Sequence, residues 1–248
     1  MRLTAELLTT SLSYLNPLKE RELDLRGHKI PAIENLGVVA RDHEAIDFTD
    51  NDIQVLGNFP LCPRLHTLLL ARNRVGTLQM SLGKSLPVLH TLVLTGNAVQ
   101  ELSDLEALGG CGRLVHLTLV GNPVVGKENY RYYVLWRCPT VRFLDFQKVK
   151  AAEREKATEL FGTHEEPTEL AKSVAAVRSR NAGAGFSAAP TANGVQKPKV
   201  KITDKEKKRF ENLVKKAKTL SDVQKLEKAF AEGRLPAGVA DEDVMDET

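Results

Sequence analysis

The stretch TLVLTGNAV, residues 91–99, decides the fold of this chain. Leu92 and Leu94 alternate with residues of the opposite face, the pattern of a short strand that buries one side. Asn97 follows where the strand must end, and its amide can both donate to and accept from backbone groups that a turn leaves unpaired. The stretch therefore predicts a short strand that ends in an asparagine turn.

The same pattern recurs four more times along the chain. It reads apolar-x-apolar-x-x-Asn-x-apolar, and the asparagines fall at positions 51, 73, 97 and 122, which gives a repeat of 22 to 25 residues. In the first copy His28 stands at the asparagine position, where it could imitate part of the bonding of an amide. Three copies carry a further leucine three residues upstream, which completes the pattern of a leucine-rich repeat. The other copies are ELDLRGHKI (22–30), AIDFTDNDI (45–53), TLLLARNRV (67–75) and HLTLVGNPV (116–124).

These repeats predict an α/β fold, a leucine-rich-repeat solenoid. Its strands would form one curved parallel sheet of about five repeats, closed by a cap at each end and followed by a flexible linker and C-terminal helices. The asparagines would form a ladder of buried amides with a structural role, because each occupies the same place in its turn. Its members are Asn51, Asn73, Asn97 and Asn122.

Both ends of a solenoid need a cap, since a bare terminal repeat exposes its core. We expect a folded domain over residues 1–163, with a helical N-terminal cap over 1–20, repeats over 21–125 and a C-terminal cap over 126–163. In the first cap, the expected helix N-cap is Thr4 and the apolar stripe is Leu7, Leu8, Leu12 and Leu15. In the second, the residues expected to shield the last repeat are Tyr130, Val134, Leu135, Phe143, Leu144 and Phe146.

The composition changes after the repeats. Residues 164–202 are rich in Gly, Ala, Pro and Asn in their second half and predict a mostly flexible linker, helical in part. Residues 203–232 predict a basic amphipathic helix or helix pair, which would dock on a partner. Residues 233–248 predict an acidic disordered tail. A nearly neutral body with a basic arm favours an anionic or acidic partner.

Several classes of protein are disfavoured by what the sequence lacks. There is no apolar run long enough to cross a membrane and no secretion signal, so we expect no membrane partner. The three cysteines are far apart, which predicts neither a disulfide framework nor a zinc site. No catalytic motif occurs, and we expect no enzyme, no cofactor and no metal.

One stretch imitates a nucleotide-binding loop. GNPVVGKEN, residues 121–129, contains G-x-x-x-x-G-K. However, Glu128 stands where such a loop needs Ser or Thr for magnesium, and Gly121 and Asn122 already belong to the repeat. The stretch is therefore interpreted as the last asparagine turn running into the cap.

The outward strand positions form what we call the concave face, the side of the sheet that a solenoid leaves open for binding. Its first two repeats carry charge, whereas Leu69, Ala71 and Val93 give it a small apolar centre. A charged rim beside an apolar centre suits an amphipathic helix of another protein.

Several phrases outside the repeat pattern carry a closer resemblance. RELDLRGHKIPAIENLG, AIDFTDNDI, YRYYVL and VRFLDFQKVK are similar to the family of A-prime proteins of the U2 small nuclear ribonucleoprotein, and the match extends over residues 3–163. The resemblance implies a structural component of this nuclear particle in pre-mRNA splicing, which supports recognition of the intron branch site. It also implies a partner with an RNA-recognition motif, of the B-double-prime type, that binds the concave face. Together the two proteins would bind the terminal stem-loop of U2 small nuclear RNA. The helices predicted over residues 203–232 would then contact other spliceosomal proteins.

The resemblance implies two sets of site residues. Those carried over as contacts of the partner are Asp24, Arg26, Asp47, Thr49, Leu69, Ala71, Val93, Thr95 and Thr118. Four basic residues are candidates for contact with RNA phosphate groups, because of their charge and their position at an edge of the domain. They are Arg26, Lys29, Lys148 and Lys150.

An alternative remains, since regulatory or adaptor subunits of protein phosphatases use similar repeats and caps. That alternative predicts an acidic or aromatic concave face, and it leaves RGHKIPAIENLG unexplained.

Overall fold

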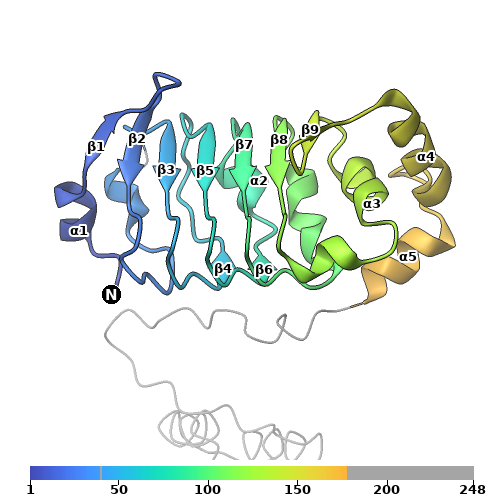
Figure 1. The fold of residues 1–248 in the computed structure, drawn as a ribbon, viewed down its shortest axis with the longest axis horizontal. Coiled ribbons are helices and arrows are strands. Elements are labelled where there is room, and N and C mark those ends of the chain that lie inside the picture. The colour runs from blue at the N-terminus through green and yellow to red at the C-terminus, as the bar shows by residue number, and fades with distance from the viewer. Residues whose placement is uncertain (40, 178–248) are drawn as a thin grey trace, which may run out of the picture. The chain divides into compact units, whose positions relative to one another are not determined.

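The computed structural model describes residues 1–39 and 41–177, which belong to one compact unit. Its main sheet has eight strands in the order β1-β2-β3-β5-β7-β8-β9-β10 (Figure 1). The strands are β1 (Ser13–Leu15), β2 (Arg21–Asp24), β3 (Ala45–Asp47), β5 (Thr67–Leu69), β7 (Thr91–Val93), β8 (His116–Thr118), β9 (Phe143–Leu144) and β10 (Gln147–Lys148). The helix or helix pair predicted for residues 203–232, the acidic tail predicted for 233–248 and the part of the predicted linker beyond residue 177 lie outside the described residues.

The five repeats form the solenoid that the leucine spacing predicts. Strands β2 to β9 pair in parallel, and the register places Leu23, Ile46, Leu68, Leu92, Leu117 and Leu144 side by side. All six are buried. The second apolar position of each repeat also faces inward, and its residues are Leu25, Phe48, Leu70, Leu94 and Leu119. The fold class inferred from the sequence is confirmed.

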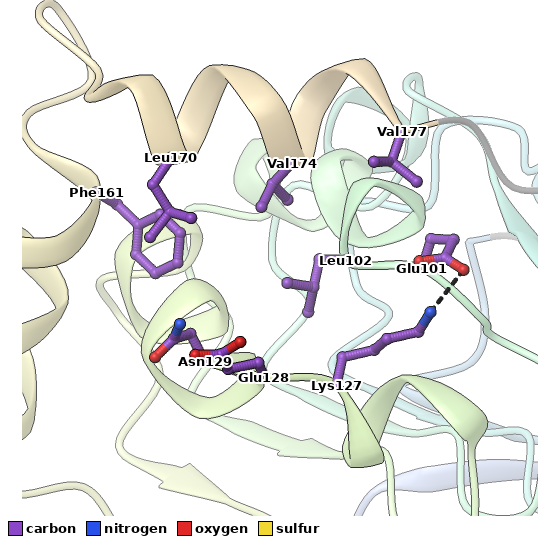
Figure 2. Close-up of a pocket in the computed structure, with 9 residues that line it drawn as sticks. All are labelled: Glu101, Leu102, Lys127, Glu128, Asn129, Phe161, Leu170, Val174 and Val177. Atoms are coloured by element: carbon purple, nitrogen blue, oxygen red, sulfur yellow. Dashed lines mark hydrogen bonds and ion pairs between the residues drawn. The ribbon is translucent and has the colours of Figure 1, made fainter.

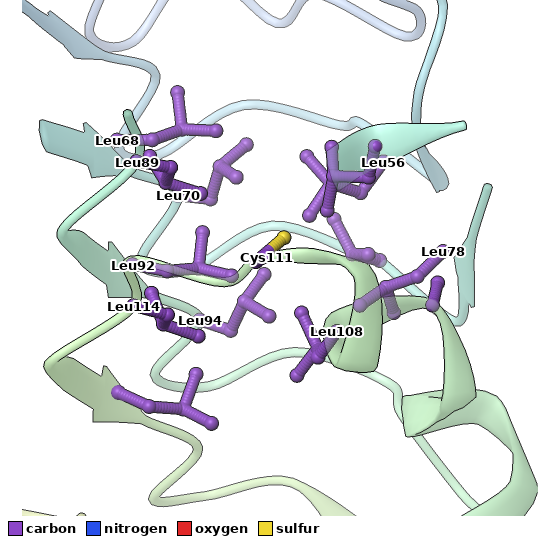
Figure 3. Packing of buried hydrophobic residues seen from close by; sticks show 14 of the residues in the cluster. Leu56, Leu68, Leu70, Leu78, Leu89, Leu92, Leu94, Leu108, Cys111 and Leu114 are labelled. Carbon is purple, nitrogen blue, oxygen red and sulfur yellow. The ribbon is translucent and has the colours of Figure 1, made fainter. Parts of the chain in front are cut away.

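The return segments between strands close the other side of the core (Figure 3). Leu56 and Leu78 face the strand leucines from a second, two-stranded sheet of β4 (Val55–Leu56) and β6 (Thr77–Leu78). Leu108 comes from a 3₁₀ helix. The short helices of this side are η1 (Leu36–Val38), α2 (Leu82–Ser85) and η2 (Leu102–Gly110).

The asparagines lie buried at the same point of successive turns. The Asn97 amide donates to the carbonyls of Leu94 (2.9 Å) and Leu70 (2.8 Å), and its oxygen accepts from Val75 N–H (2.9 Å). The other three asparagines make the same hydrogen bonds to backbone groups of their own turn and of the preceding repeat. They are Asn51, Asn73 and Asn122. His28 takes no part in this pattern, because its side chain makes no hydrogen bond to a described residue.

The N-terminal cap is only partly helical. Helix α1 (Ala5–Thr10) begins at Thr4, whose hydroxyl accepts from Leu7 N–H (3.2 Å). The predicted helix over 1–20 is wrong beyond Thr10, because β1 follows and pairs antiparallel with β2. Leu12 and Leu15, expected on the helical stripe, are exposed. Pro17 disfavours helical geometry at residue 16, and the open edge of β2 gains hydrogen-bonding partners from β1.

The C-terminal cap consists of η3 (Pro123–Gly126), α3 (Tyr130–Arg137), the β9–β10 hairpin and α4 (Ala151–Phe161). Four of the residues expected to shield the last repeat are buried, namely Tyr130, Val134, Leu135 and Leu144. The expectation is wrong for Phe143 and Phe146, which are 38% and 79% exposed. The hairpin turns between Leu144 and Gln147, so Phe146 lies at its tip rather than over the core.

The folded unit extends past the expected boundary at residue 163. Helix α5 (Glu169–Ala176) begins at Thr168 and buries Ala171. Figure 2 shows Leu170, Val174 and Val177 lying above Leu102 of η2 and Phe161 of α4, around a pocket whose rim carries the Lys127–Glu101 ion pair (2.7 Å). Lys127, the lysine of the imitation nucleotide loop, is thus engaged by Glu101 directly after η3.

Candidate protein and RNA interface

The concave face consists of three rows of outward side chains. The register defines an edge row, Glu22, Ala45, Thr67, Thr91 and His116. It also defines a middle row, Asp24, Asp47, Leu69, Val93 and Thr118. A turn row follows where the strands end, and it contains Arg26, Thr49, Ala71, Thr95 and Val120.

The edge row is largely covered at its N-terminal end. Tyr14 in β1 donates to the carboxylate of Glu22 (2.8 Å), and Asn16 donates to the same carboxylate (3.0 Å). Thr67 donates to Glu20, in the turn between β1 and β2 (3.1 Å). As a result Glu22 and Thr67 are buried, and the charge expected on the first repeats is less accessible than the sequence indicated.

The acidic end of the middle row is engaged by its own chain. Asp24 accepts from the guanidinium of Arg26 (2.9 Å to Nε), and Asp47 lies 3.6 Å from the same group. Both carboxylates also accept from the backbone N–H two residues on, Asp24 from Arg26 and Asp47 from Thr49. The hydrogen bond from Arg26 lowers the pKa of Asp24. Arg26 is therefore partly neutralised before any partner or phosphate arrives.

The apolar centre remains accessible. Leu69, Ala71 and Val93 are half-buried, as are Thr49 and Thr95 beside them, whereas Thr118 is buried. Two residues that were not among the predicted site residues extend this centre toward the C-terminal cap. Phe143 stacks on His116, with ring centroids 4.9 Å apart and planes 3° from parallel.

The four phosphate candidates lie at opposite ends of the sheet. Arg26 and Lys29 follow β2, whereas Lys148 is in β10 and Lys150 precedes α4. β2 and β10 are six places apart in the strand order, and at about 4.8 Å per strand this is roughly 30 Å. One RNA stem could meet both pairs only by crossing the whole concave face.

The C-terminal pair is the freer of the two. Lys148 and Lys150 are exposed, and neither forms an ion pair with any residue that the structure describes. The nearby carboxylate of Glu153 is already bonded to Arg131 (2.7 Å) and to the backbone N–H of Lys150 (2.8 Å).

One signal in the sequence does predict that the edge row is covered at its N-terminal end. Asn-Pro at 16–17 is a turn signal, and the Asn16 carboxamide oxygen accepts from the backbone N–H groups of Leu18 and Glu20 (3.0 and 2.9 Å). A turn at this point predicts a hairpin that folds back over the first strand. By contrast, no pattern in the sequence distinguishes Phe143 and Phe146 from core residues.

The three cysteines are buried in the described part of the chain. Burial raises the pKa of Cys62 and Cys111 to about 11 and that of Cys138 to about 12, so these thiols stay protonated. Among residues 1–39 and 41–177, no three His, Cys, Asp or Glu side chains gather as a metal site requires. None of the helices in that range is long and apolar enough to cross a membrane.

Comparison with known proteins gives a consistent result. A model of the leucine-rich repeat family matches residues 1–175. The U2 small nuclear ribonucleoprotein A′ of Neurospora crassa is 60% identical, and the match covers 100% of both chains. The human protein of the same name is 42% identical over 95% of this chain and 90% of its own. In a crystal structure of the Drosophila melanogaster SNF/U2A′ complex, one chain is 48% identical with a TM-score of 0.64, covering 66% of this chain and 95% of that one.

Proposed function

This chain belongs to the leucine-rich-repeat family of U2 small nuclear ribonucleoprotein A′ proteins, and from that premise we propose that its concave face binds a protein with an RNA-recognition motif. The partner is of the B-double-prime type, and the pair binds the terminal stem-loop of U2 small nuclear RNA. In this role the chain is a structural component of the particle, acts in the nucleus and supports recognition of the intron branch site. The SNF/U2A′ complex of a relative supports a protein partner of this kind.

The accessible apolar centre is the observation that carries the proposal. From β2 to β8 the face spans four strand spacings, or about 19 Å, which matches a helix of about 13 residues at 1.5 Å per residue. Leu69 and Val93 lie in the middle of this span. An amphipathic helix can therefore place its apolar stripe on them.

The RNA contribution of the chain is expected to be secondary to that of its partner. Residues 1–162 hold 19 basic and 18 acidic residues, so the folded body has little net attraction for a polyanion. Bases in the loop are read by the partner, as single-stranded RNA is read by stacking on such modules. Lys148 and Lys150 add contacts to the phosphate backbone of the RNA at the C-terminal end of the concave face.

Substitution of the apolar centre tests the proposal. Leu69→Asp and Val93→Asp should each weaken binding of the purified partner at least about 20-fold, because a buried carboxylate without a partner costs about 2 kcal/mol or more. Leu61→Asp is the matched control, since Leu61 is 63% exposed on the return side of its repeat. Isothermal calorimetry measures the affinities and circular dichroism verifies folding. Folded Leu69 and Val93 variants that bind as tightly as the Leu61 variant would refute the assignment of the concave face.

A further inference from the structure

The β9–β10 hairpin has an unusual tip. Its two turn residues, Asp145 and Phe146, have φ angles of 51° and 64°, in the left-handed region. Tight hairpins that need this geometry typically use Asn or Asp followed by Gly. A bulky aromatic residue at positive φ is a genuine outlier, and such strain persists where it serves a function.

Packing does not explain the aromatic residue. Phe146 is 79% exposed, more than any other large apolar side chain in the described part of the chain. A glycine at this position would remove the strain and sacrifice little buried area.

The hairpin is nevertheless held firmly. Asp145 accepts from the Leu119 N–H (2.7 Å) and from the hydroxyl of Tyr130 (2.8 Å), which ties the tip to the last repeat and to α3. Arg131 donates to the carbonyl of Leu144 (3.3 Å). Phe146 is therefore presented to solvent on a rigid support.

Three exposed cationic side chains lie in or directly beside the hairpin. Lys148 pairs with Phe143 across the hairpin, and Arg142 bonds Val149 through its backbone carbonyl (2.8 Å). Arg142, Lys148 and Lys150 are exposed and form no ion pair within residues 1–39 and 41–177. Two carboxylates that neighbour these cations in the sequence, those of Asp145 and Glu153, already accept hydrogen bonds from other groups.

We propose that this hairpin is an RNA site in which Phe146 stacks on one unpaired base beside the U2 stem. Arg142, Lys148 and Lys150 contact the flanking phosphates. A ring without donors or acceptors can recognise a base only through its face, and an A-form stem hides those faces between its pairs. Stacking on an aromatic side chain combined with backbone cations is the general mode of single-strand binding. A protein partner is disfavoured, because three cations in or beside one hairpin, none of them in an ion pair with a described residue, suit a polyanion better than an apolar pocket.

This inference rests on the proposed function and is tested in the reconstituted complex of the full chain with its partner. Two labelled probes are used, the blunt U2 terminal stem-loop and the same stem-loop extended by unpaired nucleotides beside the stem. Phe146→Gly should weaken binding of the extended probe between about fivefold and 100-fold, the usual effect of one stacked base. It should leave the blunt probe and the protein partner unaffected, whereas Phe146→Trp should bind the extended probe as the native chain does.

Phe146→Gly should also remain folded, so a loss of binding would not be caused by unfolding. Glycine adopts positive φ without strain, so the melting temperature of Phe146→Gly should not fall. Leu18→Ala, which removes a 76% exposed side chain from the turn between β1 and β2, is the matched control and should change nothing.

Each outcome bears on a different claim. Equal binding of the extended probe by native and Phe146→Gly complexes overturns the stacking site alone. Loss of partner affinity in Phe146→Gly also overturns it, because the ring would then be a protein anchor. A native complex that binds neither probe refutes the proposed function itself, and the stacking site with it.

Discussion

At the scale of single residues, the buried asparagines connect one repeat to the next. Asn97 bonds backbone groups of its own turn and of the preceding repeat, so it links two repeats that are separated by more than 20 positions. The sequence alone predicts this position, because an amide at a fixed offset from alternating leucines has few other uses. It does not predict that His28 stays outside the ladder.

Removal of one amide should destabilise the solenoid. Asn97→Ala leaves the buried Val75 N–H without an acceptor and the carbonyls of Leu70 and Leu94 without this donor. We expect the free energy of unfolding in urea to fall by about 2 to 4 kcal/mol. Thr95→Ala, two residues earlier on the concave face, should cost less than about 1 kcal/mol. Equal stability of the two variants would show that the ladder is dispensable.

A histidine near the edge row should make stability depend on pH. Partial desolvation lowers the pKa of His90, an exposed residue, below its usual value of 6.5, and positive charge on His116, His66 and Arg142 adds to the effect while Glu20 opposes it. The folded state therefore resists protonation that the unfolded chain accepts, so stability is lost as pH falls from about 6.5.

The measurement is the melting temperature of native chain and His90→Gln between pH 7 and pH 5. The native chain should lose more stability than the variant over this interval. Carboxylates whose pKa is lowered, such as Glu34 and Glu153, start from 4.5 and respond only at lower pH. Parallel curves for the two proteins would contradict this account of His90.

At the scale of elements, alternation of leucines predicts the strands well because the buried face dictates it. The caps are less predictable, since their residues serve an edge rather than a repeat. Leu12 and Leu15 have helical spacing, yet β1 forms because the edge of β2 needs a partner. Phe143 and Phe146 look like core residues in the sequence, and only the hairpin geometry shows them exposed.

The candidate site could likewise be predicted from the sequence only in part. The middle and turn rows follow from strand alternation, so the apolar centre at Leu69 and Val93 could be predicted. The sequence could not show that Arg26 is engaged by Asp24 and Asp47, because that contact depends on the distance between two neighbouring strands.

Salt dependence tests the role of the hairpin lysines. Lys148→Gln and Lys150→Gln should each reduce the slope of log affinity against log salt by about one unit, in the complex with partner and U2 stem-loop RNA. Lys84→Gln, an exposed residue of α2 on the return side, is the control and should leave the slope unchanged. Slopes that match the native complex would remove both lysines from the RNA contact.

At the scale of the whole molecule, the folded unit is larger than the repeats suggest. Its predicted end was residue 163, the end of the expected C-terminal cap, whereas α5 follows that residue and covers η2 and α4. The physical reason is that Leu102 and Phe161 are apolar and need α5 to cover them (Figure 2).

Two truncated chains test whether the folded unit ends at residue 163 or includes α5. A chain that ends at Val177 should keep the melting temperature of the full chain within about 2 °C, because it retains α5. A chain that ends at Thr163 should melt at least about 4 °C lower, because it exposes the surface under Ala171 and Val174. Equal melting of both truncated chains would show that α5 contributes nothing to stability.

Capture of the native partners tests the central claim most directly. The tagged chain is purified from an extract of its own cells, bound RNA is sequenced and bound proteins are identified by mass spectrometry, with the Leu69→Asp chain in parallel. The account predicts U2 small nuclear RNA and a protein with an RNA-recognition motif on the native chain, and loss of both on the variant. Recovery of a phosphatase catalytic subunit without U2 RNA would contradict it.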